Sequence, residues 1–167
     1  MTAPTWTLDP THSAITFSVR HMVFAKVRGR FTAFNGTISP DAADLSNATI
    51  EATIDTASID TGVPDRDTHL QSADFFNVEA FPHMQFKSTR IVDNGGGQLT
   101  IVGDLTIKDV TQSVELDAHF GGQAQDPWGN TRVAFSATTS LDRRDFGLTW
   151  NQVLEAGGVL VGERIDI

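Results

Sequence analysis

The stretch QLTIVGDLTIK, residues 98–108, sets an apolar residue or a glycine at every second position. In an extended chain, successive side chains point to opposite faces, so one face of this stretch is apolar along its whole length. That face consists of Leu99, Ile101, Gly103, Leu105 and Ile107. The row predicts a β-strand that packs one face against a hydrophobic core.

The same period of two recurs in other parts of the chain, namely residues 13–21, 48–54, 83–88, 114–120, 133–141 and 159–167. Turn-forming residues separate these strands, and they include Asn35-Gly36, Asp93–Gly97, Gly121-Gly122, Asp126–Asn130 and Gly157-Gly158. We expect a tight hairpin at Lys108–Thr111, in which Asp109 is the residue able to tolerate the left-handed conformation. Strands that follow one another across short turns predict antiparallel pairing.

Two segments break this rhythm. Pro64–Asn77 begins with proline and acidic residues and predicts a short helix, and Leu148–Ala156 is a weaker helical candidate. With no linker or repeat, we expect one all-β domain over residues 1–167. Long rows without a Cys–Trp–Cys pattern favour a closed barrel of about eight strands, which either fills its interior with side chains or holds one small ligand.

Composition excludes several classes of function. A net charge of −9 disfavours a nucleic-acid partner, and the absence of Cys rules out disulfides, thiol catalysis and Cys-based metal sites. There are 11 Phe and no Tyr, so phenol acid–base chemistry is also missing. The first ten residues lack a basic region and an apolar region, and no apolar run reaches the roughly 20 residues of a membrane span, so we expect a cytoplasmic protein without stable membrane insertion.

Three polar motifs contain residue types found in catalytic or metal sites, but their arrangement in the sequence does not fit such sites. Asp65, Asp67 and His69 have metal-ligand side chains, but on a helix residues two apart diverge, so we interpret them as helix-start electrostatics and expect no metal. Asp9-Pro-Thr-His12-Ser13 contains the residue types of a hydrolase triad, and we expect it to form a turn instead. Asp145–Gly147 spells the magnesium-binding triplet of kinases by chance, with Phe146 in the core and Gly147 in a turn.

The charge is unevenly distributed. No acid lies between Pro10 and Pro40, whereas four cations do: Arg20, Lys26, Arg28 and Arg30. Their even numbering places them opposite Phe17 and Phe31 in a continuous strand. They either discourage edge pairing or form a rim for an anionic headgroup. His21, on the apolar parity, is either a satisfied core histidine or a polar anchor near that rim.

Several motifs together resemble the YceI-like family over nearly the whole chain. They are Trp6–His21, Val27–Gly36, Ala57–Thr61, Arg66–Leu70 with Asp74–Phe76, Phe81–Ser88, Gly103–Thr111 and Arg144–Leu148. Asp109 stands where the family usually has Gly, and some relatives look periplasmic. The resemblance implies a lipocalin-like antiparallel barrel that encloses a polyisoprenoid or related lipid, often as a homodimer, without catalysis or a cofactor other than that lipid.

We therefore expect a protein that binds, transports or stores a polyisoprenoid or isoprenoid quinone inside the barrel. The apolar tail would lie against Phe17, Val19, Phe31, Phe86, Ile101, Leu105 and Phe135, and the head would contact His21 with Arg20 or Arg28. Two alternatives stay open. An enzyme acting on a small apolar substrate would use His21 or His69 beside a carboxylate, and a filled barrel would serve as a protein-interaction module.

Overall fold

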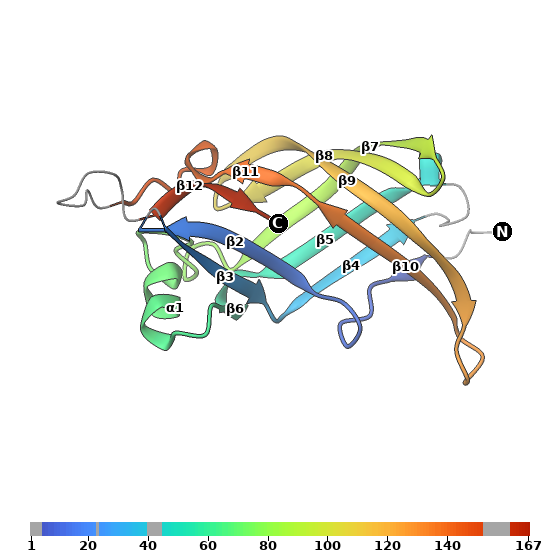
Figure 1. Ribbon diagram of the computed structural model, residues 1–167, viewed down its shortest axis with the longest axis horizontal. Helices are drawn as coiled ribbons and strands as arrows, with labels where there is room; N and C mark the ends of the chain where they lie inside the picture. The colour runs from blue at the N-terminus through green and yellow to red at the C-terminus, as the bar shows by residue number, and fades with distance from the viewer. Residues whose placement is uncertain (1–4, 23, 40–44, 152–160) are drawn as a thin grey trace.

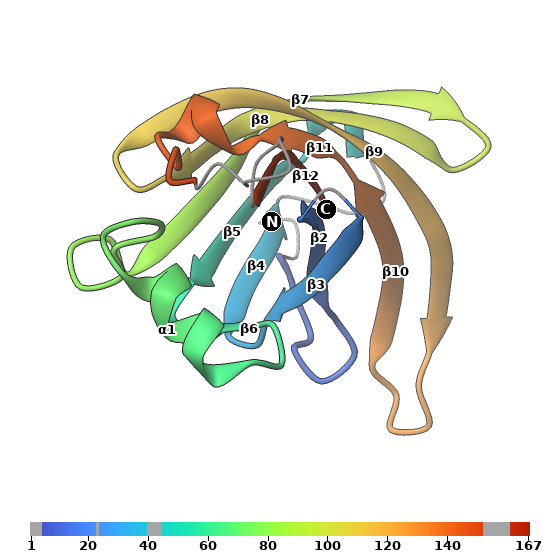
Figure 2. The ribbon, with the colours of Figure 1, turned by 60° about the vertical axis from the view of Figure 1, so that its left-hand side comes forward.

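The computed structural model describes residues 5–22, 24–39, 45–151 and 161–167. These residues form two antiparallel sheets around a common interior (Figures 1 and 2). The seven-stranded sheet has the order β1 (Trp6–Thr7), β4 (Phe34–Ser39), β5 (Thr49–Asp55), β7 (His83–Gly95), β8 (Gln98–Ile107), β9 (Val110–Gln125) and β10 (Thr131–Thr138). The five-stranded sheet has the order β11 (Ser140–Asp142), β12 (Val161–Asp166), β2 (Ile15–His21), β3 (Ala25–Phe31) and β6 (Ile59–Asp60).

The predicted all-β class with a lipocalin-like antiparallel barrel architecture is confirmed. The number of strands is larger than the predicted count of about eight, because the described residues form twelve strands in two sheets. The additional strands include β1, β6 and β11, which have two or three residues each. An alternation of hydrophobicity cannot be recognised over so short a stretch.

The seven-stranded sheet is built mostly from neighbours in sequence. Successive hairpins join β7 to β8, β8 to β9 and β9 to β10. In β8 every second residue is buried, from Leu99 through Ile107, as the alternation predicts. At the β8–β9 hairpin it is Lys108, with φ of 58°, rather than Asp109 that takes the left-handed conformation. The first of the two turn residues therefore adopts the backbone conformation that reverses the direction of the chain.

The five-stranded sheet joins distant parts of the chain. β12 lies between β11 and β2, so it pairs the end of the described chain with the beginning. β2 and β3 form a hairpin with unbroken register, in which Phe17 lies opposite Gly29 and Arg20 lies opposite Lys26. Figure 1 shows the β2–β3 turn at the same end of the molecule as α1, whereas the β9–β10 turn lies at the other end.

The helix α1 runs over Pro64–Gln71 and confirms the first predicted helix, although it ends before Asn77. Short 3-10 turns occur at Leu45–Asn47 (η1), Thr56–Ser58 (η2) and Arg143–Phe146 (η3). The second helical candidate has no helix from Leu148 to Asn151, and its remaining residues lie outside the described part of the chain. No helix in the described part is long and apolar enough to cross a membrane.

The buried core lies against the inner face of the seven-stranded sheet and extends to Phe31, Phe146 and Leu148. Phe146 is 2% exposed, and Gly147 caps η3 with a φ of 78°, so both residues have the roles expected from the sequence. Asp9 accepts hydrogen bonds from the backbone and hydroxyl of Thr11 and contacts the His12 ring at 2.8 Å. The triad-like motif is therefore a turn.

Candidate functional site

The predicted apolar lining falls on the inner faces of both sheets. Phe31, Phe86, Ile101 and Leu105 belong to the buried core, and Phe17 and Phe135 are half-buried and pack against it. The half-buried rings contact other rings, with centroid distances of 5.5 Å for Phe17–Phe31 and 5.2 Å for Phe135–Phe120. The seven predicted positions thus share the interior, but four of them are core residues rather than open surface.

Two of these rings lie over glycines of the neighbouring strand. A Cβ at Gly29 would come within 2.4 Å of the Phe17 Cζ atom, and one at Gly103 within 2.5 Å of the Phe86 Cζ atom. A glycine with no side chain lets the ring fold down against its own sheet. The rings therefore line the wall instead of projecting towards the middle of the barrel.

An aliphatic row crosses four strands of the five-stranded sheet. Leu141 lies opposite Ile165, Ile165 opposite Val19, and Val19 opposite Val27, so the four side chains share the inner face. All four are half-buried. Leu141 packs against the core cluster, whereas the other three described side chains do not. We call Leu141, Ile165, Val19 and Val27 the aliphatic row, and it is apolar wall that the core leaves partly uncovered.

His21 is the next inward position on β2 after Val19. It lies opposite Ala25 on β3 and Val161 on β12 and is half-buried. Its ring forms no hydrogen bond with any other described residue, and because it is only half-buried it remains open to a ligand or to water. A half-buried imidazole beside an apolar wall is suited to bind the polar head of an amphiphile.

Arg20 and Arg28 lie on the other side of the sheet. Both are exposed, and their cross-strand partners Lys26 and Ser18 share the outer face with them. The parity prediction for these cations is confirmed, because they alternate with the inward Phe17 and Val19. The structure does not bring them together with the aliphatic row, so a shared headgroup contact with His21 stays a prediction.

A second histidine has a carboxylate partner. The Nε2 atom of His69 on α1 lies 2.9 Å from an Asp74 carboxylate oxygen, and its ring meets Phe75 and Trp150 edge-on at 5.2 and 4.6 Å. The His69 side chain is 38% exposed, and the nearby hydroxyl of Ser72 donates to the His69 backbone carbonyl. This arrangement provides packing between α1 and Trp150, and no described hydroxyl is placed for activation by the His69 ring.

Arg143 stabilises the same region around Trp150, and the sequence analysis did not identify it. It is 6% exposed and donates hydrogen bonds to the carbonyls of Leu148, Trp150, Val161 and Gly162 over 2.7–3.3 Å. Burial lowers the pKa of Arg143, but a guanidinium remains charged at neutral pH. A charged side chain thereby holds the chain after η3 against the beginning of β12.

The polar residues of α1 attach the helix to the sheet. Arg66 donates to the hydroxyl and the carbonyl of Thr61 at 2.8 and 2.7 Å, and Asp67 accepts from the Thr61 backbone N–H at 2.9 Å. Asp65, Asp67 and His69 do not converge, and the described residues include no group of three or more acidic or histidine side chains placed to hold a metal ion. Their contacts are therefore structural.

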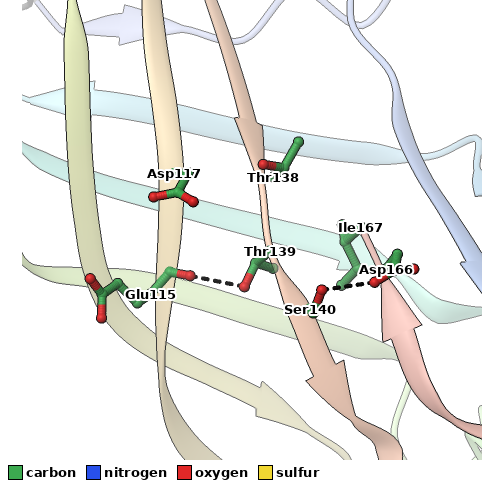
Figure 3. A pocket seen from close by; sticks show the side chains of 7 residues that line it. All are labelled: Glu115, Asp117, Thr138, Thr139, Ser140, Asp166 and Ile167. Carbon is green, nitrogen blue, oxygen red and sulfur yellow. Dashed lines mark hydrogen bonds between the residues drawn. The ribbon is translucent and has the colours of Figure 1, made fainter.

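A polar hollow of about 480 Å³ lies where β9, β10 and β11 meet the end of the chain (Figure 3). Its lining residues are Glu115, Asp117, Thr138, Thr139, Ser140, Asp166 and Ile167. Glu115 and Asp117 are exposed and alternate with the inward residues of β9, so the hollow is on the outer surface. Its carboxylates make it unsuitable for an apolar chain.

The model of the YceI-like domain matches residues 6–167. The chain belongs to the YceI-like family. A UPF0312 protein of Vibrio cholerae is 40% identical over 137 residues, which cover 82% of this chain and 72% of the relative. A UPF0312 protein of Shewanella baltica is 42% identical over 140 residues, covering 84% and 73%. The resemblance seen in the sequence motifs is thereby confirmed.

Solved YceI-like structures share the fold. The Campylobacter jejuni YceI protein is 31% identical, with a TM-score of 0.69 and coverage of 85% of this chain and 83% of that one. Burkholderia cenocepacia BcnA superposes with a TM-score of 0.82 at 21% identity, covering 95% and 94%. A polyisoprenoid-binding domain from Saccharophagus degradans has a TM-score of 0.63 at 14% identity, covering 96% and 92%. The last two similarities establish the fold alone.

Proposed function

We propose that this YceI-like protein binds a long-chain apolar amphiphile of the polyisoprenoid or isoprenoid quinone class inside the barrel. The aliphatic row carries the proposal, because it places apolar side chains inside the molecule without covering them completely. A filled barrel used only as an interaction module would cover such a wall with its own side chains. The fold shared with a polyisoprenoid-binding domain supports the same ligand class.

The tail and the head of the ligand would use different residues. The tail would lie along the aliphatic row beside Phe17 and Phe135, and each methylene removed from water contributes about 0.8 kcal/mol. His21, at the end of β2, would hydrogen-bond the polar head and fix its direction. Binding energy would come mainly from the tail, whereas the head would set orientation.

We propose binding rather than catalysis. The described residues include two His–Asp pairs. The His12–Asp9 pair lies in a turn with the His12 side chain 80% exposed, and the His69–Asp74 pair packs against two aromatic rings and faces no placed nucleophile. A transport role, a homodimer and a cytoplasmic location stay predictions from the sequence. Cell fractionation and sedimentation of the native protein check the last two.

Native mass spectrometry tests the proposed ligand. We expect the gently purified protein to carry an added mass of a prenyl lipid, and delipidated protein to take up solanesol or a ubiquinone. The inward Val19→Asp substitution should reduce that uptake at least about tenfold, because a carboxylate on the wall must be desolvated beside the tail. The outward Thr16→Asp substitution on the same strand is the matched control and should leave uptake unchanged.

Circular dichroism of both variants would confirm that the fold is retained. A delipidated wild-type protein that takes up no prenyl lipid would overturn the proposed function. Equal uptake by the Val19→Asp variant would show that the aliphatic row is not the binding wall.

A further inference from the structure

The turn between β2 and β3 presents apolar side chains to solvent. Phe24 is 96% exposed and Met22 is 49% exposed. A phenylalanine so exposed contributes nothing to the stability of the fold, since the hydrophobic effect favours a ring only when it is removed from water. The turn therefore carries an unused apolar surface at one end of the molecule (Figure 1).

Three cations without an ion-pair partner lie directly behind this turn. Arg20 and Lys26 face each other across the hairpin on its outer face, and Arg28 follows further along β3. Arg30 forms an ion pair with Asp60 at 3.2 Å, whereas the other three have no carboxylate within ion-pair distance among the described residues. In a chain of net charge −9, this face is locally positive.

Acidic side chains close to this face are already engaged. Asp166 on β12 accepts hydrogen bonds from Ser140 and Arg164, each at 2.8 Å. Lys26 contributes only a minor Coulomb interaction to the lowered pKa of Asp166. The positive charge of Arg20, Lys26 and Arg28 is thus available to a partner.

We propose that the β2–β3 hairpin docks the protein on an anionic phospholipid surface, with Phe24 inserted among the headgroups. Aromatic rings favour the membrane interface, and each Lys or Arg near an anionic leaflet contributes about a fivefold gain in affinity at low salt. Phe24 and Met22 are exposed at this turn, and a bilayer interface can receive such side chains without a preformed socket. Because His21 ends the same strand, docking would bring the proposed head-binding position close to the lipid.

The β9–β10 turn provides an internal contrast. Trp128 at its tip is 82% exposed, but the neighbouring Asp126 accepts hydrogen bonds from the backbone of Trp128 and Asn130 and from the Arg132 side chain. Arg132 also pairs with Asp9 at 2.9 Å. This tip has an exposed ring without unpaired cations, so it should not bind an anionic surface.

Vesicle flotation tests the docking proposal. Wild-type protein should float with phosphatidylcholine vesicles that contain about 30 mol % phosphatidylglycerol and not with pure phosphatidylcholine, and about 0.5 M salt should release it. Phe24→Ser and Lys26→Glu should each weaken binding by about tenfold. Trp128→Ser and Lys108→Glu are the matched controls and should bind like the wild type.

Three results would overturn the proposal. They are equal binding to neutral and anionic vesicles, unchanged binding of the Phe24→Ser variant, and loss of a wild-type dimer in that variant by sedimentation velocity, which would make the tip a contact between copies. Phe24 and Lys26 lie outside the apolar wall, so uptake of prenyl lipid from detergent should be unchanged in both variants. Failure of that uptake in the wild type would instead contradict the proposed function and leave the docking result standing.

Discussion

Each sheet holds one phenylalanine ring over a glycine of the neighbouring strand, yet the surroundings of the two pairs differ. In the seven-stranded sheet, Phe86 covers Gly103 and is 8% exposed within the buried core. In the five-stranded sheet, Phe17 covers Gly29 but stays half-buried, beside the aliphatic row. The same contact of a ring with a glycine therefore belongs to the packed core in the seven-stranded sheet and to a partly uncovered wall in the five-stranded sheet.

The difference indicates that the two sheets have different roles. The inner faces of β7 and β8 are buried almost without interruption. The inner faces of β2 and β12 stay half-buried, as the proposed ligand wall requires. Substitutions in the first wall should then change stability, and substitutions in the second should change binding.

The largest expected effect is at Arg143, which holds the chain after η3 against the beginning of β12 in the five-stranded sheet. Arg143→Met keeps the length of the side chain but removes the guanidinium donor from the buried or partly buried carbonyls of Leu148, Trp150 and Gly162, whereas the Val161 carbonyl keeps the Asn151 amide as a donor. We expect the free energy of unfolding in urea to fall by about 4 kcal/mol. Arg143→Lys should be intermediate, and a loss below about 1 kcal/mol for the Met variant would show that the contacts are dispensable.

Gly103→Ala should be the next most destabilising change. The added Cβ would meet the Phe86 ring and also the Lys87 backbone carbonyl, at 2.7 Å, which cannot move without disturbing the sheet. We expect a loss of about 3 kcal/mol in the free energy of unfolding, measured in urea, with little effect on prenyl lipid uptake by the folded fraction. A larger effect on uptake than on stability would contradict the division between the walls.

Gly29→Ala should reduce lipid uptake more than it reduces stability. Here the added Cβ meets only the end of the Phe17 ring, which can swing into the interior. We expect a loss of about 1 kcal/mol in stability and about a tenfold loss in lipid uptake, because the displaced ring would occupy the space beside the aliphatic row. Calorimetry and native mass spectrometry on the same preparation separate the two effects.

The smallest expected effect is that of pH on the five-stranded sheet. Hydrogen bonds from the Arg144 side chain lower the pKa of Asp142 to about 2. A carboxyl with a lowered pKa stabilises the folded state above its unfolded pKa of about 3.9, and that contribution is lost as the pH falls towards the folded value. The melting temperature should therefore decline between about pH 4 and pH 2, and less so in Asp142→Asn, as differential scanning calorimetry would show.

Sequence alternation predicted which residues face inward, because strand geometry depends only on neighbouring residues. Leu99, Ile101, Leu105 and Ile107 are all 9% exposed or less. The even numbering of Arg20 and Arg28 also predicted their outward position. The β2–β3 hairpin pairs even-numbered residues of one strand with even-numbered residues of the other, so the turn between the strands does not change which residues face outward.

The features that the alternation of hydrophobicity could not predict depend on contacts between residues that are far apart in the sequence. Three members of the aliphatic row lie on strands whose pairing the sequence does not specify, so only Val19 was chosen. Arg143 is part of a charged turn in the sequence, and its burial results from carbonyls up to 19 residues away. The unpaired state of Lys26 likewise depends on which carboxylates other cations have bound.

The position of β12 between β11 and β2 determines the order in which the molecule can fold. The hairpins of β7, β8, β9 and β10 close short loops and can form as soon as each pair of strands is available. The β2–β3 hairpin is equally local, but the other edge of β2 must wait for β12 from the far end of the chain, and that pairing is slow because the loop to be closed is long. During synthesis, the wall with the aliphatic row is therefore completed last, after the packed wall is already in place.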